Sequence, residues 1–410
     1  MKKYLVILLS LLFVLGSFSF VIADDGGMDS IRAMAPGAKM LIGGDARVRG
    51  KYVKNRDFDS EDADDDTRSW DQRVRLKFTG QVGNGFKVTT RIKVANATWG
   101  TTAGGQRATT DESSLNIDYA YITVPISSLV INAGSMNRYY GTGFMPGQYD
   151  DGYDTFEVVG KFESVTVTAF TNKITELNVT GDDNLKDLDD YGAILVADLG
   201  DIEAGAIVIL HNDGRDEPTP NPTQIGLTGT DIGLYAKGTV AGIGLTGELA
   251  FLTGDTNEDS AGNTPFGLMV QASTTVGAIG VGVGGGYATN GFTSDNNYVP
   301  TLLIGTDQHT AIGQFGSADD YKAWLIHADA NTDVMENVNV KGGVSYTSVE
   351  EAGGGDSATI LELDGKVVVQ LAKNARYIFE AAYGNPSGDA RPANEEDGII
   401  VLANRAELWF

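Results

Sequence analysis

Apolar and polar side chains alternate along most of the chain with a period of two. The clearest stretch runs from 70 to 82, where one face carries Trp70, Val74, Leu76, Phe78 and Val82, and the other carries Asp71, Arg73, Arg75, Lys77, Thr79 and Gln81. A helix would spread the apolar residues around its circumference, whereas successive side chains of a strand point to opposite faces. The pattern therefore predicts a strand, and Gly83-Asn84-Gly85 predicts a tight turn after it.

The same alternation returns up to the last residues, so we expect one domain without an interdomain linker. Further clear examples are 86–94, 232–240, 243–251, 338–347 and 361–370. Counting such segments predicts about 18 strands. The alternative is 16, because two strands near Phe162 are weakly delimited. Either number leaves room for an aqueous channel inside a closed barrel, whereas eight strands would be filled by side chains.

The connections alternate between short and long, as they do in transmembrane barrels with brief periplasmic turns and longer outer loops. The short ones are 83–85, 125–128, 200–201, 241–242, 277–280 and 372–375, and the long ones are 53–68, 100–113, 138–154, 172–190, 212–225, 253–265, 290–320, 350–357 and 385–397. The alternative fold is a soluble all-β sandwich or propeller. Such a protein would bury its apolar faces in a core and would not need this rhythm.

Both ends of the chain favour the membrane barrel. Lys2 and Lys3 precede an apolar run that ends near Ala23, so residues 1–23 are expected to be a signal peptide, with an uncleaved membrane anchor as the alternative. Residues 24–38 form a periplasmic N-terminal lead, and residues 39–410 form the barrel. At the other end an alternating strand finishes on Phe410, which we interpret as a barrel assembly signal.

Composition narrows the function. The chain has no cysteine, which excludes thiolate metal sites and covalently attached haem. Its net charge is −25, and this argues against a nucleic-acid partner because phosphates would be repelled. An acidic stretch at 57–66 could hold a divalent cation, but a solvated outer loop is the preferred interpretation. We therefore expect no cofactor and no metal site.

Basic residues gather on the polar face of the first three strands. These residues are Arg47, Lys51, Arg73, Arg75, Lys77, Lys87, Arg91 and Lys93. If the apolar face meets lipid, the cations line the lumen on strands about 4.8 Å apart and form one patch. Such a basic wall would attract anions or oppose carboxylates from a loop. The alternative is a solvated wall whose cations form ion pairs with Asp45 and Asp71.

The loop from 138 to 154 is the candidate constriction. It follows the fifth strand and combines glycines at 141, 143 and 147 with aromatic and acidic residues. The candidate residues are Tyr139, Tyr140, Tyr149, Asp150, Asp151 and Asp154.

The signal peptide, the strand rhythm, Phe410 and this loop together resemble bacterial outer-membrane porins. The stretch from Arg73 through Gly100 is most similar to the trimeric porins of sulfate-reducing and related bacteria. The resemblance implies a transmembrane antiparallel β-barrel in the outer membrane of a Gram-negative cell. It implies a water-filled channel for passive diffusion of ions and small hydrophilic solutes, with no enzymatic activity.

The resemblance also implies partners and a role for the loop. The expected partners are outer-membrane lipid and lipopolysaccharide, the barrel assembly machinery and two further copies in a homotrimer, with the run 280–286 as a glycine-rich lipid-facing stretch for close subunit contact. In porins the third loop folds inward, so Asp150, Asp151 and Asp154 would oppose Arg47, Arg73, Arg75 and Arg91. The loop lacks the Pro-Glu-Phe-Gly-Gly motif, and an outward loop with interfacial tyrosines is the alternative.

Two other functions are compatible with a barrel. One is the sheath of a porin–cytochrome conduit, which needs a wide lumen without an inward loop. The other is an outer-membrane lipid hydrolase, which needs a catalytic group at the rim. No Gly-x-Ser-x-Gly elbow occurs, and the glycine-rich run at 280–285 opens no helix, so it predicts a strand and not a dinucleotide site.

Overall fold

The protein is an all-β barrel of eighteen strands. The structure, a computed structural model, describes residues 38–55, 66–83, 85–99, 115–147, 149–175, 188–213, 229–254, 264–295, 297–304, 314–317, 321–351, 357–388 and 398–410. The strands are β1 (Lys39–Lys54), β2 (Thr67–Val82), β3 (Phe86–Thr98), β4 (Asn116–Ile126), β5 (Leu129–Arg138), β6 (Tyr149–Phe162), β7 (Val165–Thr175), β8 (Leu188–Asp198), β9 (Ile202–Asp213), β10 (Gly229–Val240), β11 (Ile243–Gly254), β12 (Phe266–Val276), β13 (Ile279–Thr289), β14 (Tyr321–Met335), β15 (Val338–Glu351), β16 (Ser357–Ala372), β17 (Ala375–Gly388) and β18 (Ile399–Trp409). The predicted signal peptide and most of the lead lie outside the described residues.

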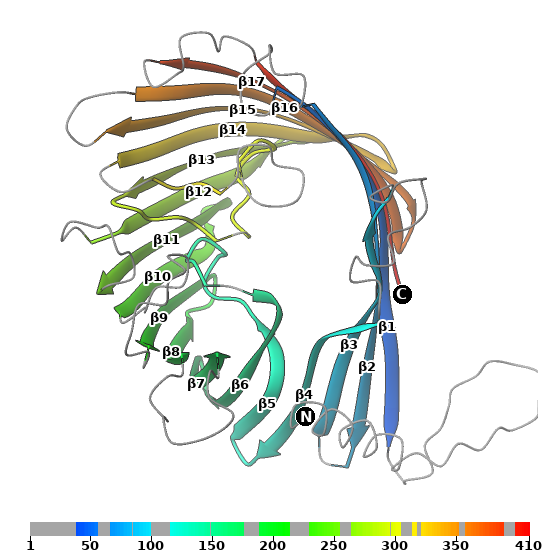
Figure 1. The fold of residues 1–410 in the computed structure, drawn as a ribbon, viewed down its shortest axis with the longest axis vertical. Helices are drawn as coiled ribbons and strands as arrows, with labels where there is room; N and C mark the ends of the chain where they lie inside the picture. The colour runs from blue at the N-terminus through cyan, green and yellow to red at the C-terminus, as the bar shows by residue number, and fades with distance from the viewer. Residues whose placement is uncertain are drawn as a thin grey trace, which may run out of the picture.

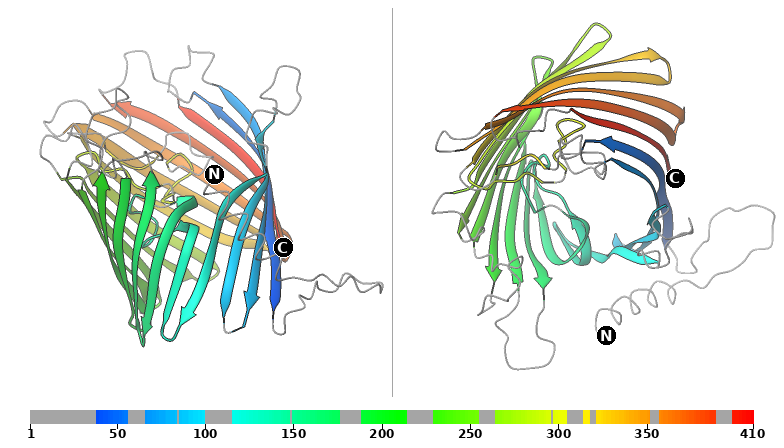
Figure 2. Two further views of the ribbon diagram at one scale, coloured as in Figure 1. Left: turned by 60° about the horizontal axis from the view of Figure 1, so that its bottom comes forward. Right: turned by 45° about the horizontal axis from the view of Figure 1, so that its top comes forward.

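The sheet closes on itself. Each strand pairs antiparallel with its neighbours in sequence, and β1 also pairs with β18, so that Arg49 lies opposite Arg405 (Figures 1 and 2). Backbone hydrogen bonds of 2.9 and 3.1 Å join Gly44 to Phe410 beside this seam. Closure pairs the strand edges that an open sheet would leave exposed. The prediction of eighteen strands is confirmed, and the alternative of sixteen is wrong. A two-residue turn after Phe162 separates β6 from β7.

The two faces of the sheet differ as the alternation predicted. In β16, Leu361 and Leu363 are 46% and 56% exposed, whereas Glu362 between them is 1% exposed. Large apolar residues are likewise exposed on the outer face of neighbouring strands, among them Val208, Leu234, Leu245, Val270, Val283, Ile326, Val344 and Phe379. Part of the lumen face, including Glu362, is covered by loops that enter the barrel. The described residues contain no helix of the length and apolarity needed to cross a membrane.

The glycine run in β13 corrects one expectation. A Cβ at Gly282 would lie 3.0 Å from a carboxylate oxygen of Asp329, and one at Gly286 would lie 2.9 Å from the ring of Phe315. These glycines therefore face the lumen, because the missing side chains would point at Asp329 and Phe315, which lie inside the barrel. The expectation that the whole run faces lipid is wrong: period-two alternation sends its even-numbered members inward and leaves Gly285 outward.

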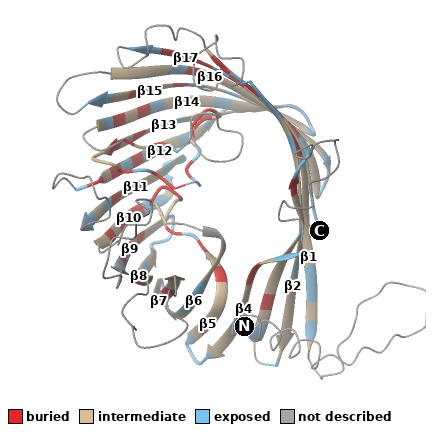
Figure 3. Ribbon diagram, viewed as in Figure 1, coloured by how far each residue is buried: buried red, intermediate tan, exposed pale blue. Residues whose placement is uncertain are grey.

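The buried core of the molecule lies inside the barrel. Two loops enter the lumen, and we call them the inner loops: residues 139–147 between β5 and β6, and residues 290–304 with 314–317 between β13 and β14. Figure 3 shows buried residues on these loops and on the strands that they contact. The main apolar cluster combines loop residues with inward residues of β7 and β9–β14.

Candidate functional site

The basic residues of β1–β3 form a patch on the lumen face. In the strand registers Arg47 lies opposite Arg73, Arg75 opposite Lys93, and Lys77 opposite Arg91. Lys51 lies further along β1, opposite Ser69, and Lys87 lies near the Gly83–Gly85 turn, opposite Gln81. The structure therefore brings six of the eight predicted cations together and places the other two toward the opposite ends of the strands.

Three carboxylates lie within this patch, and each contacts two cations. Asp45 is 2.9 Å from Arg75 Nε and 3.5 Å from Arg73 Nη2. Asp71 is 2.7 Å from Arg49 Nε and 3.4 Å from Arg47 Nη2. The predicted alternative of ion pairs with Asp45 and Asp71 is thus present together with the clustering. We call this surface of β1–β4 the charged wall.

Asp118 provides the third carboxylate. Its side chain is fully buried and lies 2.7 Å from Arg91 Nε and 2.9 Å from Lys93 Nζ. A register shift between Arg91 and Ile92 in the β3–β4 pairing places Asp118 beside Tyr119 on the lumen side. The guanidinium of Arg91 also lies 4.4 Å from the centre of the Tyr119 ring. The cations that contact these three carboxylates are Arg47, Arg49, Arg73, Arg75, Arg91 and Lys93.

The first inner loop folds into the lumen and is held by Glu248 of β11. The backbone N–H groups of Thr142 and Met145 donate to the Glu248 carboxylate at 2.6 and 2.9 Å, and the Thr142 hydroxyl donates to it as well. Gly141 has a φ of +53°, and a Cβ there would lie 2.7 Å from the same carboxylate. A buried glutamate five strands away from β6 thus fixes the loop, and only glycine fits at its closest approach.

The second inner loop uses the same device. The backbone N–H groups of Leu302 and Leu303 donate to Oε1 of Glu362 in β16 at 3.0 and 2.9 Å. Ser345 of β15 donates its hydroxyl to Oε2 at 3.2 Å. Each inner loop is therefore anchored on a buried carboxylate of a barrel strand outside the charged wall. Charge-assisted hydrogen bonds of this type are stronger than neutral ones.

The two loops meet inside the barrel. The ring of Phe144 stacks on Phe292 at 5.1 Å between centres and meets the ring of Tyr298 edge-on at 4.9 Å. The Asp295 N–H donates to the carbonyl of Phe144 at 3.0 Å. The inner loops consequently form one packed body in the lumen, as the teal and yellow segments in the interior of Figure 1 show.

The predicted constriction residues lie in different environments in the structure. Tyr140 is buried and stacks on Phe170 of β7 at 6.1 Å, whereas the neighbouring Tyr139 is half-exposed. Asp154 follows in β6 and is exposed on the face opposite to that of Thr155, which bonds Asn172 in the lumen wall. Asp154 therefore does not face the charged wall. The side chains of Tyr149, Asp150 and Asp151 lie outside the described residues.

Several residues of the site were missed from the sequence. Arg49 continues the alternation of Arg47 and could have been found from it. Glu248 and Glu362 look like ordinary lumen acids, because the loop amides that bind them lie more than fifty residues away. In the sequence the second inner loop is recognisable only as a long connection, and its aromatic residues are the signal that indicates packing.

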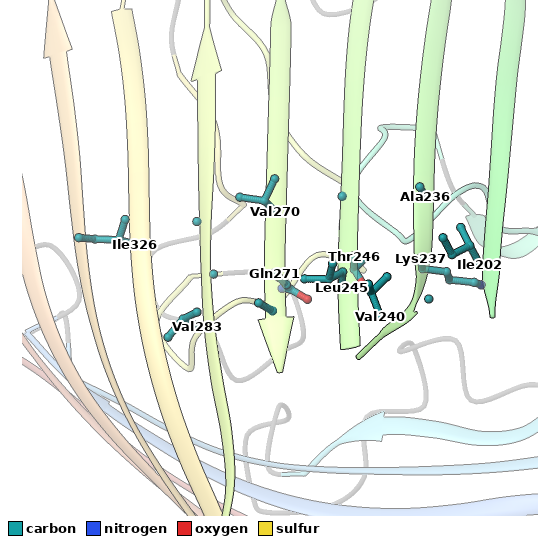
Figure 4. A pocket seen from close by; sticks show the side chains of 15 residues that line it. Ile202, Ala236, Lys237, Val240, Leu245, Thr246, Val270, Gln271, Val283 and Ile326 are labelled. Atoms are coloured by element: carbon teal, nitrogen blue, oxygen red, sulfur yellow. The ribbon is translucent and has the colours of Figure 1, made fainter. Parts of the chain in front are cut away.

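An apolar hollow lies on the outer face of β9–β14. Its volume is about 610 Å³, and small residues such as Gly247 and Gly285 form its floor between larger apolar neighbours. Figure 4 shows its lining side chains, including Val270, Val283 and Ile326. Within the run 280–286, the residues Val283, Gly284 and Gly285 line this hollow.

Comparison with known proteins places the fold. No family model and no curated protein matches the sequence. Among solved structures, OpdQ of Pseudomonas aeruginosa covers 92% of this chain and 98% of its own at 10% identity with a TM-score of 0.57. The outer membrane protein OpdK of the same organism covers 90% and 99% at 13% identity with a TM-score of 0.56. OccK7 (OpdD) covers 91% and 98% at 8% identity, also with a TM-score of 0.56. The chain therefore has the closed antiparallel fold of bacterial outer-membrane porins.

Proposed function

We propose that this protein is an outer-membrane porin that passes ions and small hydrophilic solutes by passive diffusion. The observation that carries the proposal is a closed barrel whose outer face is apolar and whose inner face carries paired charges. A barrel can span lipid because all its strand edges are paired, and eighteen strands leave space for water inside. The fold shared with OpdK, an outer membrane protein, supports the same location.

The inner loops are proposed to narrow this channel. They extend from β5–β6 and β13–β14 and cover the lumen face of β9–β14, so the charged wall stays as the polar side of the remaining passage. Arg73, Arg75 and Arg91 would then set the ion preference toward anions. In this proposal selectivity depends on channel width and on fixed charge, and no energy input is required.

The test is a planar-bilayer recording of the purified protein in a salt gradient. Discrete conductance steps with a reversal potential on the anion side support the proposal. Protein that inserts into the bilayer but conducts no ions would contradict it.

The conduit alternative is disfavoured by the inner loops, since a cytochrome sheath needs an open lumen. A hydrolase would need a histidine able to activate a nucleophile. His211 is held on both sides, with Nδ1 2.6 Å from Asp190 and Nε2 2.8 Å from Asp231, so neither of its ring nitrogens is available for that role. His327 lines cavities inside the barrel and not the outer rim that a lipid substrate would reach.

A homotrimer belongs to the same proposal and is supported by the resemblance to trimeric porins. The outer hollow of β9–β14 offers a recess for a neighbouring subunit. Native mass measurement in mild detergent should give three copies; a monomer under all detergent conditions would contradict this part alone.

A further inference from the structure

A second polar site lies inside the barrel, away from the centre of the charged wall. A cavity of about 280 Å³ lies beneath residues 299–302 of the second inner loop and against the lumen face of β14–β18. A larger cavity of about 700 Å³ adjoins it and shares Val299, Pro300, His327, Asp329 and Lys341. We call the smaller cavity the slot. Its charged lining residues are Asp329, Lys341, Asp364, Lys366, Glu380 and Arg405.

The slot has a fixed roof. The bonds from Leu302 and Leu303 to Glu362 hold the loop directly beside the slot, because Glu362 and Asp364 are two residues apart on the lumen face of β16. Val299, Pro300 and Leu302 present apolar atoms to the cavity. A loop anchored in this way reduces the access of water to the charges beneath it and strengthens their interaction with a ligand.

The charges of the slot are balanced. Lys341 Nζ lies 3.3 Å from Asp329, and its side chain is 40% exposed. Lys366 Nζ lies 2.8 Å from Glu380, and Arg405 Nη2 lies 3.7 Å from the same carboxylate. Three acids and three bases therefore alternate across five neighbouring strands.

Asp364 is the distinctive member of this set. Its carboxylate lies over Gly343 of β15, where a Cβ would be 2.9 Å from Oδ2. It makes no hydrogen bond and no ion pair with any residue that the structure describes, although it lines the slot. Because Gly343 has no side chain, the Asp364 carboxylate is open toward the cavity. Lys341, on the same strand as Gly343, also lines the cavity.

We propose that the slot binds small zwitterionic solutes, which carry an ammonium and a carboxylate group. The ammonium group binds Asp364, and the carboxylate group binds Lys341, whose exposed ammonium retains donors beyond its contact with Asp329. A solute with only a carboxylate binds Lys341 and leaves Asp364 beside its uncharged end. A solute with only an ammonium group binds Asp364 and leaves Lys341 beside its uncharged end. This inference rests on the proposed porin function and specifies one class of solute for it.

The test uses three probes of similar size on single channels in planar bilayers. Glycylglycine is the zwitterion, N-acetylglycine lacks the ammonium group, and glycylglycinamide lacks the carboxylate. For the wild-type protein we expect a saturable reduction of the KCl current by glycylglycine at concentrations about tenfold lower than for either matched probe, since one charge-assisted hydrogen bond is lost in each case.

The variants identify the site. Asp364→Asn should weaken the effect of glycylglycine about tenfold and should leave that of N-acetylglycine unchanged. Lys341→Gln should weaken the effects of both. Glu203→Gln is the matched control, because Glu203 is a lumen acid of β9 that pairs with Lys237 at 3.0 Å outside the slot; it should behave as wild type.

The outcomes separate the inference from the function on which it rests. Equal effects of the three probes, or an Asp364→Asn variant that equals Glu203→Gln, overturn the zwitterion site while the KCl conductance still supports a porin. Absence of any conductance in the wild type overturns the porin itself. If Asp364→Asn fails to assemble, Lys341→Gln decides: an unchanged response to glycylglycine overturns the site.

Discussion

The charged wall of β1–β4 and the opposite wall of β9–β13 are built from the same alternating strands, yet they fill their inward positions differently. On the charged wall the inward side chains are arginine, lysine and aspartate in shared ion pairs. On the opposite wall, Ile207, Ala250 and Met269 are buried beneath the inner loops. Strand alternation therefore determines most of the residues that point inward, with Asp118 at a register shift as an exception, and the loops determine which of those residues meet water.

The two walls also differ in what they contribute to stability. Ion pairs that stay in contact with water, such as Arg73–Asp45, typically contribute between zero and about 1 kcal/mol each. The pairs of the buried Asp118 also carry a desolvation cost, which offsets much of their attraction. Burying a large apolar side chain contributes roughly 1.5–3 kcal/mol. We infer that the covered wall and the inner loops stabilise the interior, while the charged wall is available to act on permeating ions.

The largest effect is expected from removing the first inner loop. Replacing residues 141–147 by a short Gly-Ser linker deletes Phe144 and the bonds to Glu248, so the loop body loses its central contact. Single-channel conductance should rise several-fold. Phe156→Ala, on the exposed outer face of β6, is the control and should conduct as wild type. An unchanged conductance after loop replacement would mean that the loop does not narrow the passage.

Neutralising the charged wall should change selectivity more than conductance. With Arg73, Arg75 and Arg91 replaced by Gln, the reversal potential in a KCl gradient should move by tens of millivolts toward cation preference. Arg376→Gln serves as control, since Arg376 lies in β17, outside the charged wall, and pairs with Glu407 at 2.6 Å. Equal reversal potentials for the triple variant and the control would remove the charged wall from permeation.

Breaking one anchor should loosen one loop. Glu248→Ala removes the acceptor for the amides of Thr142 and Met145, a loss of about 1.5–3 kcal/mol for a charged hydrogen-bond partner. Hydrogen exchange at Met145 should accelerate about tenfold or more. The corresponding Glu362→Ala variant should affect the amides of Leu302 and Leu303 instead. If either variant loosened both loops equally, the anchors would not be independent.

The smallest effect is expected from substituting two loop glycines, which separates the cost of backbone strain from the cost of the contact with Glu248. Gly141 and Gly147 both have positive φ, but only Gly141 approaches another group, the Glu248 carboxylate. Ala at either position should cost about 1–2 kcal/mol of backbone strain, and Gly141→Ala should cost more because the Cβ displaces the anchor. Denaturant unfolding in detergent measures both variants, and equal losses would show that the contact is unimportant.

The sequence predicted the strands well because their cause is local. Alternation from Trp70 to Val82 identifies β2 and its two faces without knowledge of any partner strand. The same reasoning placed Arg47, Arg73, Arg75 and Arg91 on one face of the sheet, and the structure has them beside the carboxylates of that face.

The loop contacts could not be predicted in the same way, because they join distant parts of the chain. Phe144 meets Phe292 across the barrel, and Glu248 binds amides more than one hundred residues away. Asp118 reaches the lumen through a register shift, which breaks the simple alternation. Asp154 was assigned to the wall-facing set by resemblance, whereas period-two geometry sends it to the outer face.

The seam between β1 and β18 has a consequence for how the molecule matures. Asp45 pairs with Trp409, so this register is the least local in the sheet. Until both strands have been synthesised and delivered, the growing sheet has two open edges that can pair with another chain. We infer that these edges must be covered by another molecule while the barrel is being assembled. The final pairing of β1 with β18 removes that need.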